Sequence, residues 1–198
     1  MRAIGKAAAG FMLAAMLATG AWAATGVQME GDYAKVSWIT WVGKEAYSGY
    51  LFTTRQPDRT TYLYYTVQCG NEPPTTGYGL IPNSALRKSA NGDLQLALDT
   101  TKVRGFVTSG PGAGGTRAGG TGAGGPIGVT WSRKGVVQTV HAGASGTQTG
   151  NVSEVTQGTW TSGGAVARGG VLGWTIGAEQ SAEWGAAVAA STQIGSGD

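Results

Sequence analysis

Apolar and polar residues alternate along most of the chain that follows residue 24, which is the period of a β-strand. In residues 33–42, the apolar Ala34 and Val36 alternate with the polar Lys35 and Ser37. Successive side chains of a strand point to opposite faces of its sheet. This run therefore predicts a strand with one face in a hydrophobic core.

Residues 93–99 show the same alternation, with leucine at every second position. The Asn91-Gly92 pair before them tolerates positive φ at both positions of a tight turn. It predicts a two-residue hairpin whose other strand is residues 85–90.

Two runs rich in β-branched and aromatic residues, 46–54 and 60–68, predict further strands. They are separated by Gln56-Pro57-Asp58, where proline restricts φ and aspartate closes the bend. We expect a turn there.

The second half of the chain predicts an antiparallel meander. Glycine-containing turns are expected at Lys134-Gly135, Gly163-Gly164 and Gly169-Gly170. They separate apolar runs at 127–131, 136–141, 151–161, 165–168 and 171–176, and a final stretch reaches residue 194. In residues 178–190 the alanines favour a helix, whereas Gly185 and the neighbouring strands favour a strand, which we expect.

About ten short strands and no helix predict an all-β fold, an antiparallel β-sandwich or jelly roll. A tyrosine-rich half, 24–108, is joined to a half rich in tryptophan, glycine and threonine, 127–198, by a glycine-rich segment, 109–126. That segment has few apolar groups to bury, so it is expected to be a loop or linker. The two halves are expected to form one domain.

Residues 1–23 have the features of a cleaved signal peptide. Arg2 and Lys6 precede an uncharged apolar run at 7–18, and Ala21-Trp22-Ala23 is a small-x-small cleavage site. The apolar run is too short to span a bilayer, which takes about 20 residues. We expect the mature chain to begin at Ala24 and to be secreted or periplasmic, with no membrane span.

Charge and cysteine content change the picture in two ways. Arg2 and Lys6 contribute two positive charges to the formal net charge of +3. Without them the mature chain is close to neutral, so a nucleic-acid partner is not expected. Cys69 is the single cysteine, so no intramolecular disulfide forms. The fold must depend on packing, with Cys69 expected as a small buried residue.

The sequence contains no recognisable cofactor or metal motif, and none is expected. His141 is the single histidine, which excludes multi-histidine metal sites and restricts a nucleophilic dyad to Cys69 with His141. We expect a surface or hydrogen-bonded histidine instead. Glu154 and Glu183 are the best-placed pair of carboxylates for glycoside hydrolysis, which uses two acids about 5 to 10 Å apart.

Aromatic residues suggest a binding surface. In residues 62–67, alternation directs Tyr62 and Tyr64 to the face opposite Leu63, with the two rings about 6.8 Å apart. Trp41 lies on the corresponding face of its own strand. Rings at this spacing stack on successive sugar rings if the face is exposed. Alternatively, both faces of a central strand are covered and the rings belong to a core.

The sequence therefore predicts a secreted, non-catalytic binding module for a glycan or cell-surface polymer, with Trp41, Tyr62 and Tyr64 as the ligand site. One alternative is a small secreted glycoside hydrolase that uses Glu154 and Glu183. Another is a structural or surface-assembly protein whose exposed strand edges promote association.

Overall fold

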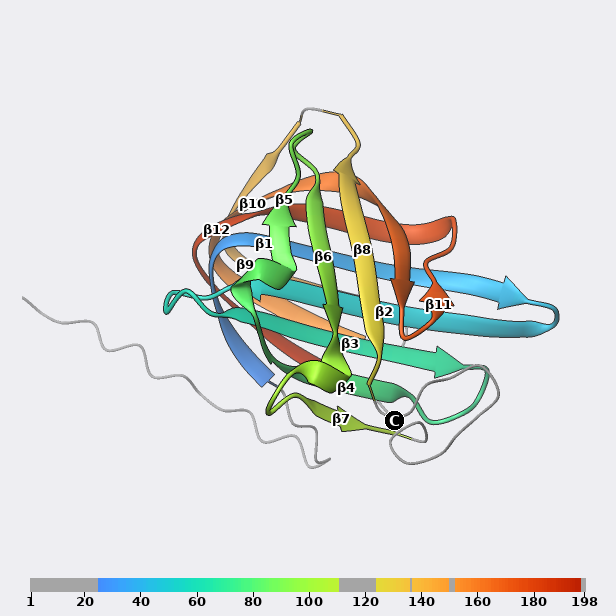
Figure 1. Cartoon of the computed structure of the whole chain (residues 1–198). Coiled ribbons are helices and arrows are strands. Elements are labelled where there is room, and N and C mark those ends of the chain that lie inside the picture. Colours follow the sequence, from blue (N-terminus) through green and yellow to red (C-terminus); the bar gives the residue numbers. More distant parts are fainter. Residues whose placement is uncertain (1–24, 111–123, 136, 150–151, 197–198) are drawn as a thin grey trace, which may run out of the picture.

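The computed structural model describes residues 25–110, 124–135, 137–149 and 152–196 (Figure 1). The signal-peptide prediction and most of the glycine-rich segment fall outside these residues. The prediction of an antiparallel all-β fold is confirmed, and no α-helix occurs in the described ranges. The strands are β1 (Thr25–Val42), β2 (Glu45–Arg55), β3 (Thr61–Cys69), β4 (Thr75–Ile81), β5 (Leu86–Lys88), β6 (Leu94–Asp99), β7 (Val107–Ser109), β8 (Pro126–Arg133), β9 (Thr139–Thr149), β10 (Val152–Val171), β11 (Trp174–Thr175) and β12 (Glu179–Ser196).

These strands form one sheet, and not the two sheets that define a β-sandwich. Ten strands follow the order β5-β6-β8-β10-β12-β1-β2-β3-β4-β7, while β9 and β11 pair with β10. The first and second halves of the chain meet twice, where β6 pairs with β8 and where β1 pairs with β12. The finer prediction of a sandwich or jelly roll is therefore not confirmed, because the sheet curls on itself to bury its apolar faces.

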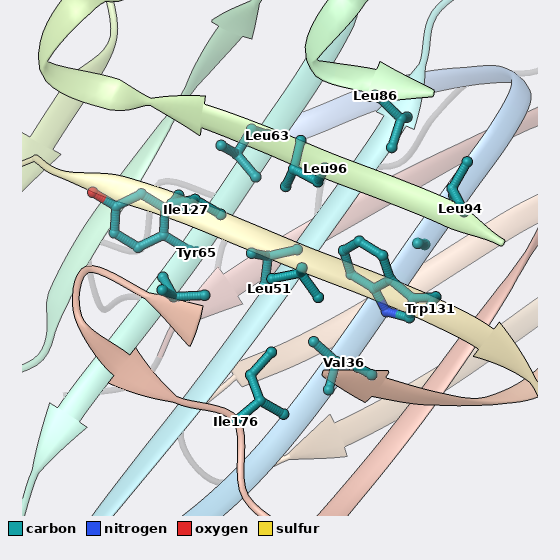
Figure 2. Packing of buried hydrophobic residues seen from close by; sticks show 14 of the residues in the cluster. Val36, Leu51, Leu63, Tyr65, Leu86, Leu94, Leu96, Ile127, Trp131 and Ile176 are labelled. Atoms are coloured by element: carbon teal, nitrogen blue, oxygen red, sulfur yellow. The ribbon is translucent and has the colours of Figure 1, made fainter. Parts of the chain in front are cut away.

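The curl encloses a front core. β5, β6 and β8 cross in front of β1, β2 and β3, and the side chains between them are aliphatic or aromatic (Figures 1 and 2). This front core contains Ala34, Val36, Trp38, Leu51, Leu63, Tyr65, Val67, Ile81, Ala85, Leu86, Leu94, Leu96, Ile127, Val129, Trp131, Ala165, Ala167, Val171, Leu172, Ile176 and Trp184.

A back core lies on the opposite face of β2 and β3. It contains Val27, Met29, Tyr33, Tyr50, Phe52, Tyr62, Tyr64, Val152, Trp160, Ala187, Ala190 and Ile194. The first halves of β1 and β10 and the second half of β12 cover this face. The pairing register shifts between Met29 and Gly31 of β1 and between Thr159 and Trp160 of β10, and in both ladders the extra residue lies on β12, between Ala187 and Ala190. Such a bulge bends the sheet locally, and the three long strands β1, β10 and β12 contribute to one core on one side of it and to the other core on the other side.

β2 and β3 are consequently buried on both faces, as the run of buried residues in β3 from Thr61 to Val67 shows. Two glycines permit close packing on the front face. A Cβ on Gly49 would overlap the indole of Trp38, and a Cβ on Gly77 would overlap the ring of Tyr65, which lies directly opposite it. Glycine is thus required where an aromatic ring lies across the neighbouring strand.

The turn predictions have mixed outcomes. The turn at 56–58 is confirmed, since Arg59 N–H donates to Gln56 O at 2.9 Å. The hairpin at Asn91-Gly92 is present, although Ser89 N–H donates to Asp93 O at 2.9 Å, so its loop holds three residues instead of two. Of residues 178–190, all but Ala178 lie in strand β12, as expected.

The predicted turns at Gly163-Gly164 and Gly169-Gly170 are wrong. Both lie within the 20-residue strand β10. At Gly169, whose φ is +125°, a Cβ would overlap the carbonyl of Gly128 on β8. This glycine therefore allows two backbones to approach, which local sequence does not distinguish from a turn.

Candidate functional site

The structure separates the three residues predicted to bind a ligand. Tyr62 and Tyr64 point to the face opposite Leu63, as alternation predicts, but that face is the back core, where the two side chains are 6% and 4% exposed. Trp41 is 61% exposed near the end of β1. The exposed platform that the prediction requires is absent, because the bent halves of β1, β10 and β12 cover the two tyrosines.

The carboxylate pair, in contrast, is brought together. Lys35 Nζ on β1 lies 3.2 Å from Glu154 Oε2 on β10 and 3.4 Å from Glu183 Oε1 on β12. Tyr50 Oη on β2 donates to Glu154 Oε2 at 2.7 Å, and Tyr33 Oη donates to Glu183 Oε1 at 3.2 Å. Four strands thus meet at one charged cluster at the border of the back core.

Burial and the neighbouring carboxylates raise the pKa values of the lysine and the two phenols of this cluster. Burial would lower the pKa of Lys35, but Glu154 and Glu183 outweigh it and the pKa is raised. Burial, followed by the effect of Glu154, raises the pKa of Tyr50. Burial and then Glu183 do the same for Tyr33. The lysine remains charged and both phenols remain hydrogen-bond donors to the carboxylates.

A cavity of about 70 Å³ adjoins the cluster, and His141 of β9 lines it. The imidazole stacks on Trp160 with ring centroids 4.8 Å apart, and its Nε2 lies 2.8 Å from Ser162 Oγ. This is the hydrogen-bonded histidine that the sequence led us to expect. Cys69, whose Sγ lies 3.8 Å from Glu45 Oε2, is half-buried on β3 and does not line this cavity.

A larger cleft of about 330 Å³ opens on the same face of β1, β2, β3 and β12. Strand register arranges its floor in two rows that cross the four strands. The inner row is Ser181, Ser37, Tyr50 and Thr66, and the outer row is Glu179, Ile39, Ser48 and Gln68. Thr149 and Val152, at the facing ends of β9 and β10, also line the cleft.

The cleft lies beside the charged cluster. The next row inward contains Glu183 and Lys35, and Tyr50 both lines the cleft and donates to Glu154. On the other side, Trp41 follows Ile39 on the same face of β1, beyond the outer row. The structure thus places Trp41 two positions beyond the outer row, outside the lining of the cleft, and Tyr64 in the covered row that continues from Lys35 through Phe52.

Several polar groups in the cleft are available to a ligand. The side chains of Ser37, Ser48, Glu179 and Ser181 form no hydrogen bond or ion pair with another residue in the described part of the chain. Apolar surface beside them comes from Tyr50, Ile39 and Val152. Sequence reasoning missed these residues because polar positions opposite a buried face are also what an ordinary solvent-facing strand presents.

Comparison of the chain with family models, with curated proteins and with solved structures finds no match. Across the described residues, no helix has the length and hydropathy to cross a membrane. No group of three or more histidine, cysteine, aspartate or glutamate side chains suited to a metal ion occurs within them. The chemistry of the cleft therefore carries the functional argument.

Proposed function

We propose that this protein is a non-catalytic binding protein, secreted or periplasmic, whose cleft takes a segment of a glycan or cell-surface polymer. The observation that carries the proposal is the cleft itself, in which unpartnered hydroxyls and a carboxylate lie beside apolar side chains. A sugar has the matching character, with hydroxyls around its edge and apolar C–H faces. Binding sites of this kind are apolar concavities with a few placed polar groups, and about 330 Å³ is within their usual range.

The charge of the cleft supports a neutral ligand. Glu179 is the single charged residue among those described in its lining, and no lysine or arginine is present there to bind phosphate. A nucleic-acid ligand would require several such cations. The proposal thus keeps the ligand class that the sequence predicts, but it moves the site from Tyr62 and Tyr64 to the cleft.

A retention assay on insoluble polysaccharides, followed by titration of soluble fragments of any polysaccharide that retains the protein, tests the proposal. Ser181→Trp places an indole in the cleft from an exposed position, so affinity should fall about tenfold or more. Val188→Trp is the matched control, because it adds the same ring to an exposed position elsewhere on β12.

Unchanged affinity in Ser181→Trp would contradict the assignment of the cleft, and a wild-type protein that binds no polysaccharide would contradict the ligand class. A shared loss in both tryptophan variants would show that the loss is not specific to the cleft.

Glycoside hydrolysis is the second candidate, and the approach of Glu154 and Glu183 to one another favours it. Against it, Lys35 lies between the two carboxylates, where the scissile oxygen would have to enter. Reducing-sugar release across a polysaccharide panel separates the candidates. Release that is lost in Glu183→Gln would support the hydrolase, whereas release that persists would exclude this pair.

A further inference from the structure

The strand edges of this sheet differ in how well they are protected against pairing with another chain. The main path ends at β5 and β7, each three residues long, and β5 carries the exposed Arg87 and Lys88. Short length and edge charges are two devices by which monomeric proteins block edge-to-edge association. β9 has neither.

Among the described strands, β9 has a long edge that pairs with no other strand. All eleven of its residues pair in unbroken register with β10 on one side, and no other described strand pairs with it. The strand contains no lysine, arginine, aspartate, glutamate or proline, and every residue except His141 and Thr149 is exposed. Its outward N–H and C=O groups therefore form a template for a further strand.

The composition of β9 favours a second copy as the occupant. Glycine, alanine, serine and threonine make up most of the strand, so two copies can approach closely without steric conflict. Because β9 is uncharged, self-pairing incurs no like-charge repulsion. Antiparallel pairing of a strand with itself about a twofold axis also closes on itself, so the assembly stops at a dimer.

We propose that the open edge of β9 pairs with the same edge of a second copy of this chain, antiparallel, with the twofold axis at Ala144. In this register Thr139 of one copy lies opposite Thr149 of the other, so threonines meet at both ends. His141, Ser145 and Thr147 line the small cavity, so alternation places Ala144 on the outer face of the strand. The two Ala144 side chains then lie side by side.

Sedimentation of the purified protein over a wide concentration range tests the pairing. The wild type should show a reversible monomer–dimer equilibrium. Ala144→Lys places two lysines together at the axis and should weaken the dimer about tenfold or more, and Ala144→Glu should do the same. An equimolar mixture of the two variants should restore the dimer, because lysine then faces glutamate.

Val188→Lys is the control, since it adds a charge to another exposed position, on β12, and should leave the equilibrium unchanged. Circular dichroism of each variant establishes that the sheet is intact. A wild type that remains monomeric at every concentration would overturn the proposal. A dimer that survives in both Ala144 variants, or variants that fail to restore it when mixed, would also overturn it.

Discussion

The front core and the back core are buried against opposite faces of the same strands, yet their contents differ. The front core is built from aliphatic and aromatic side chains, with Trp131 fully buried and its Nε1 donating to Lys35 O at 3.1 Å. The back core borders a cluster of one lysine, two glutamates and two tyrosines, and a cleft opens beside it. The front core is thus closed by apolar side chains, whereas the back core ends at a charged cluster beside an open cleft.

Truncating the front core should have the largest effect. Trp131→Ala removes a fully buried side chain and leaves a cavity, so the free energy of unfolding should fall by about 4 kcal/mol. Urea denaturation measures this. Trp41→Ala is the matched control, since Trp41 is largely exposed and the change should be no more than about 0.5 kcal/mol. Similar losses in both variants would remove the distinction between core and surface.

Breaking the charged cluster should have the next largest effect. Lys35→Met leaves Glu154 almost fully buried without its cation, and the free energy of unfolding should fall by about 2 to 3 kcal/mol, because the pair is partly open to solvent. Lys102→Met, which removes an exposed lysine paired with Asp99, should produce no measurable change in the same urea titration. An unchanged or higher stability of Lys35→Met would mean that the cluster contributes nothing to holding the back core together.

A glycine substitution should have a smaller effect. A Cβ on Gly77 would overlap the ring of Tyr65, so Gly77→Ala should lower the free energy of unfolding by about 2 kcal/mol. In Gly128→Ala on β8 the new Cβ meets no atom within 4 Å, and the change should be small. Thermal unfolding of the two variants gives the comparison, and equal stabilities would refute the role assigned to Gly77.

Alkaline pH should destabilise the back core more than the front core. The pKa values of Tyr50, Tyr33 and Lys35 are raised in the folded protein. Below about pH 10 these groups are protonated in both states. Above it the unfolded chain releases their protons while the folded chain retains them, so the free energy of unfolding falls as pH rises, by about 1.4 kcal/mol per pH unit for each group.

Urea midpoints between about pH 8 and about pH 11 measure this slope. Tyr50→Phe removes one of these groups, so it should reduce the slope of the decline by about 1.4 kcal/mol per pH unit. In the front core, burial raises the pKa of Tyr65 to about 12. This tyrosine therefore stops adding to the decline in the free energy of unfolding above that pH. A stability that stays flat up to about pH 11 would contradict the raised pKa values.

The candidate site shows which structural features the sequence could predict and which it could not. Alternation in residues 62–67 predicted the faces of Tyr62 and Tyr64, but not that a bend in three other strands covers one of those faces. The bend follows from a bulge in β12 between Ala187 and Ala190. No local pattern predicts that one extra residue in β12 shifts its register with both of its neighbours, β1 and β10.

By itself the sequence determined the strand-rich class, the turn at residues 56–58, the hairpin at Asn91-Gly92, and which side chains share a face of each strand. These features depend on neighbours within a few residues, where the two-residue period and turn chemistry act. The tertiary structure alone decided which faces are covered, that Lys35 lies between Glu154 and Glu183, and that four strands align their polar residues into a cleft. These features depend on the pairing register between strands, including β1 with β12, which lie more than a hundred residues apart, because moving one strand by a single residue would exchange its buried and exposed faces.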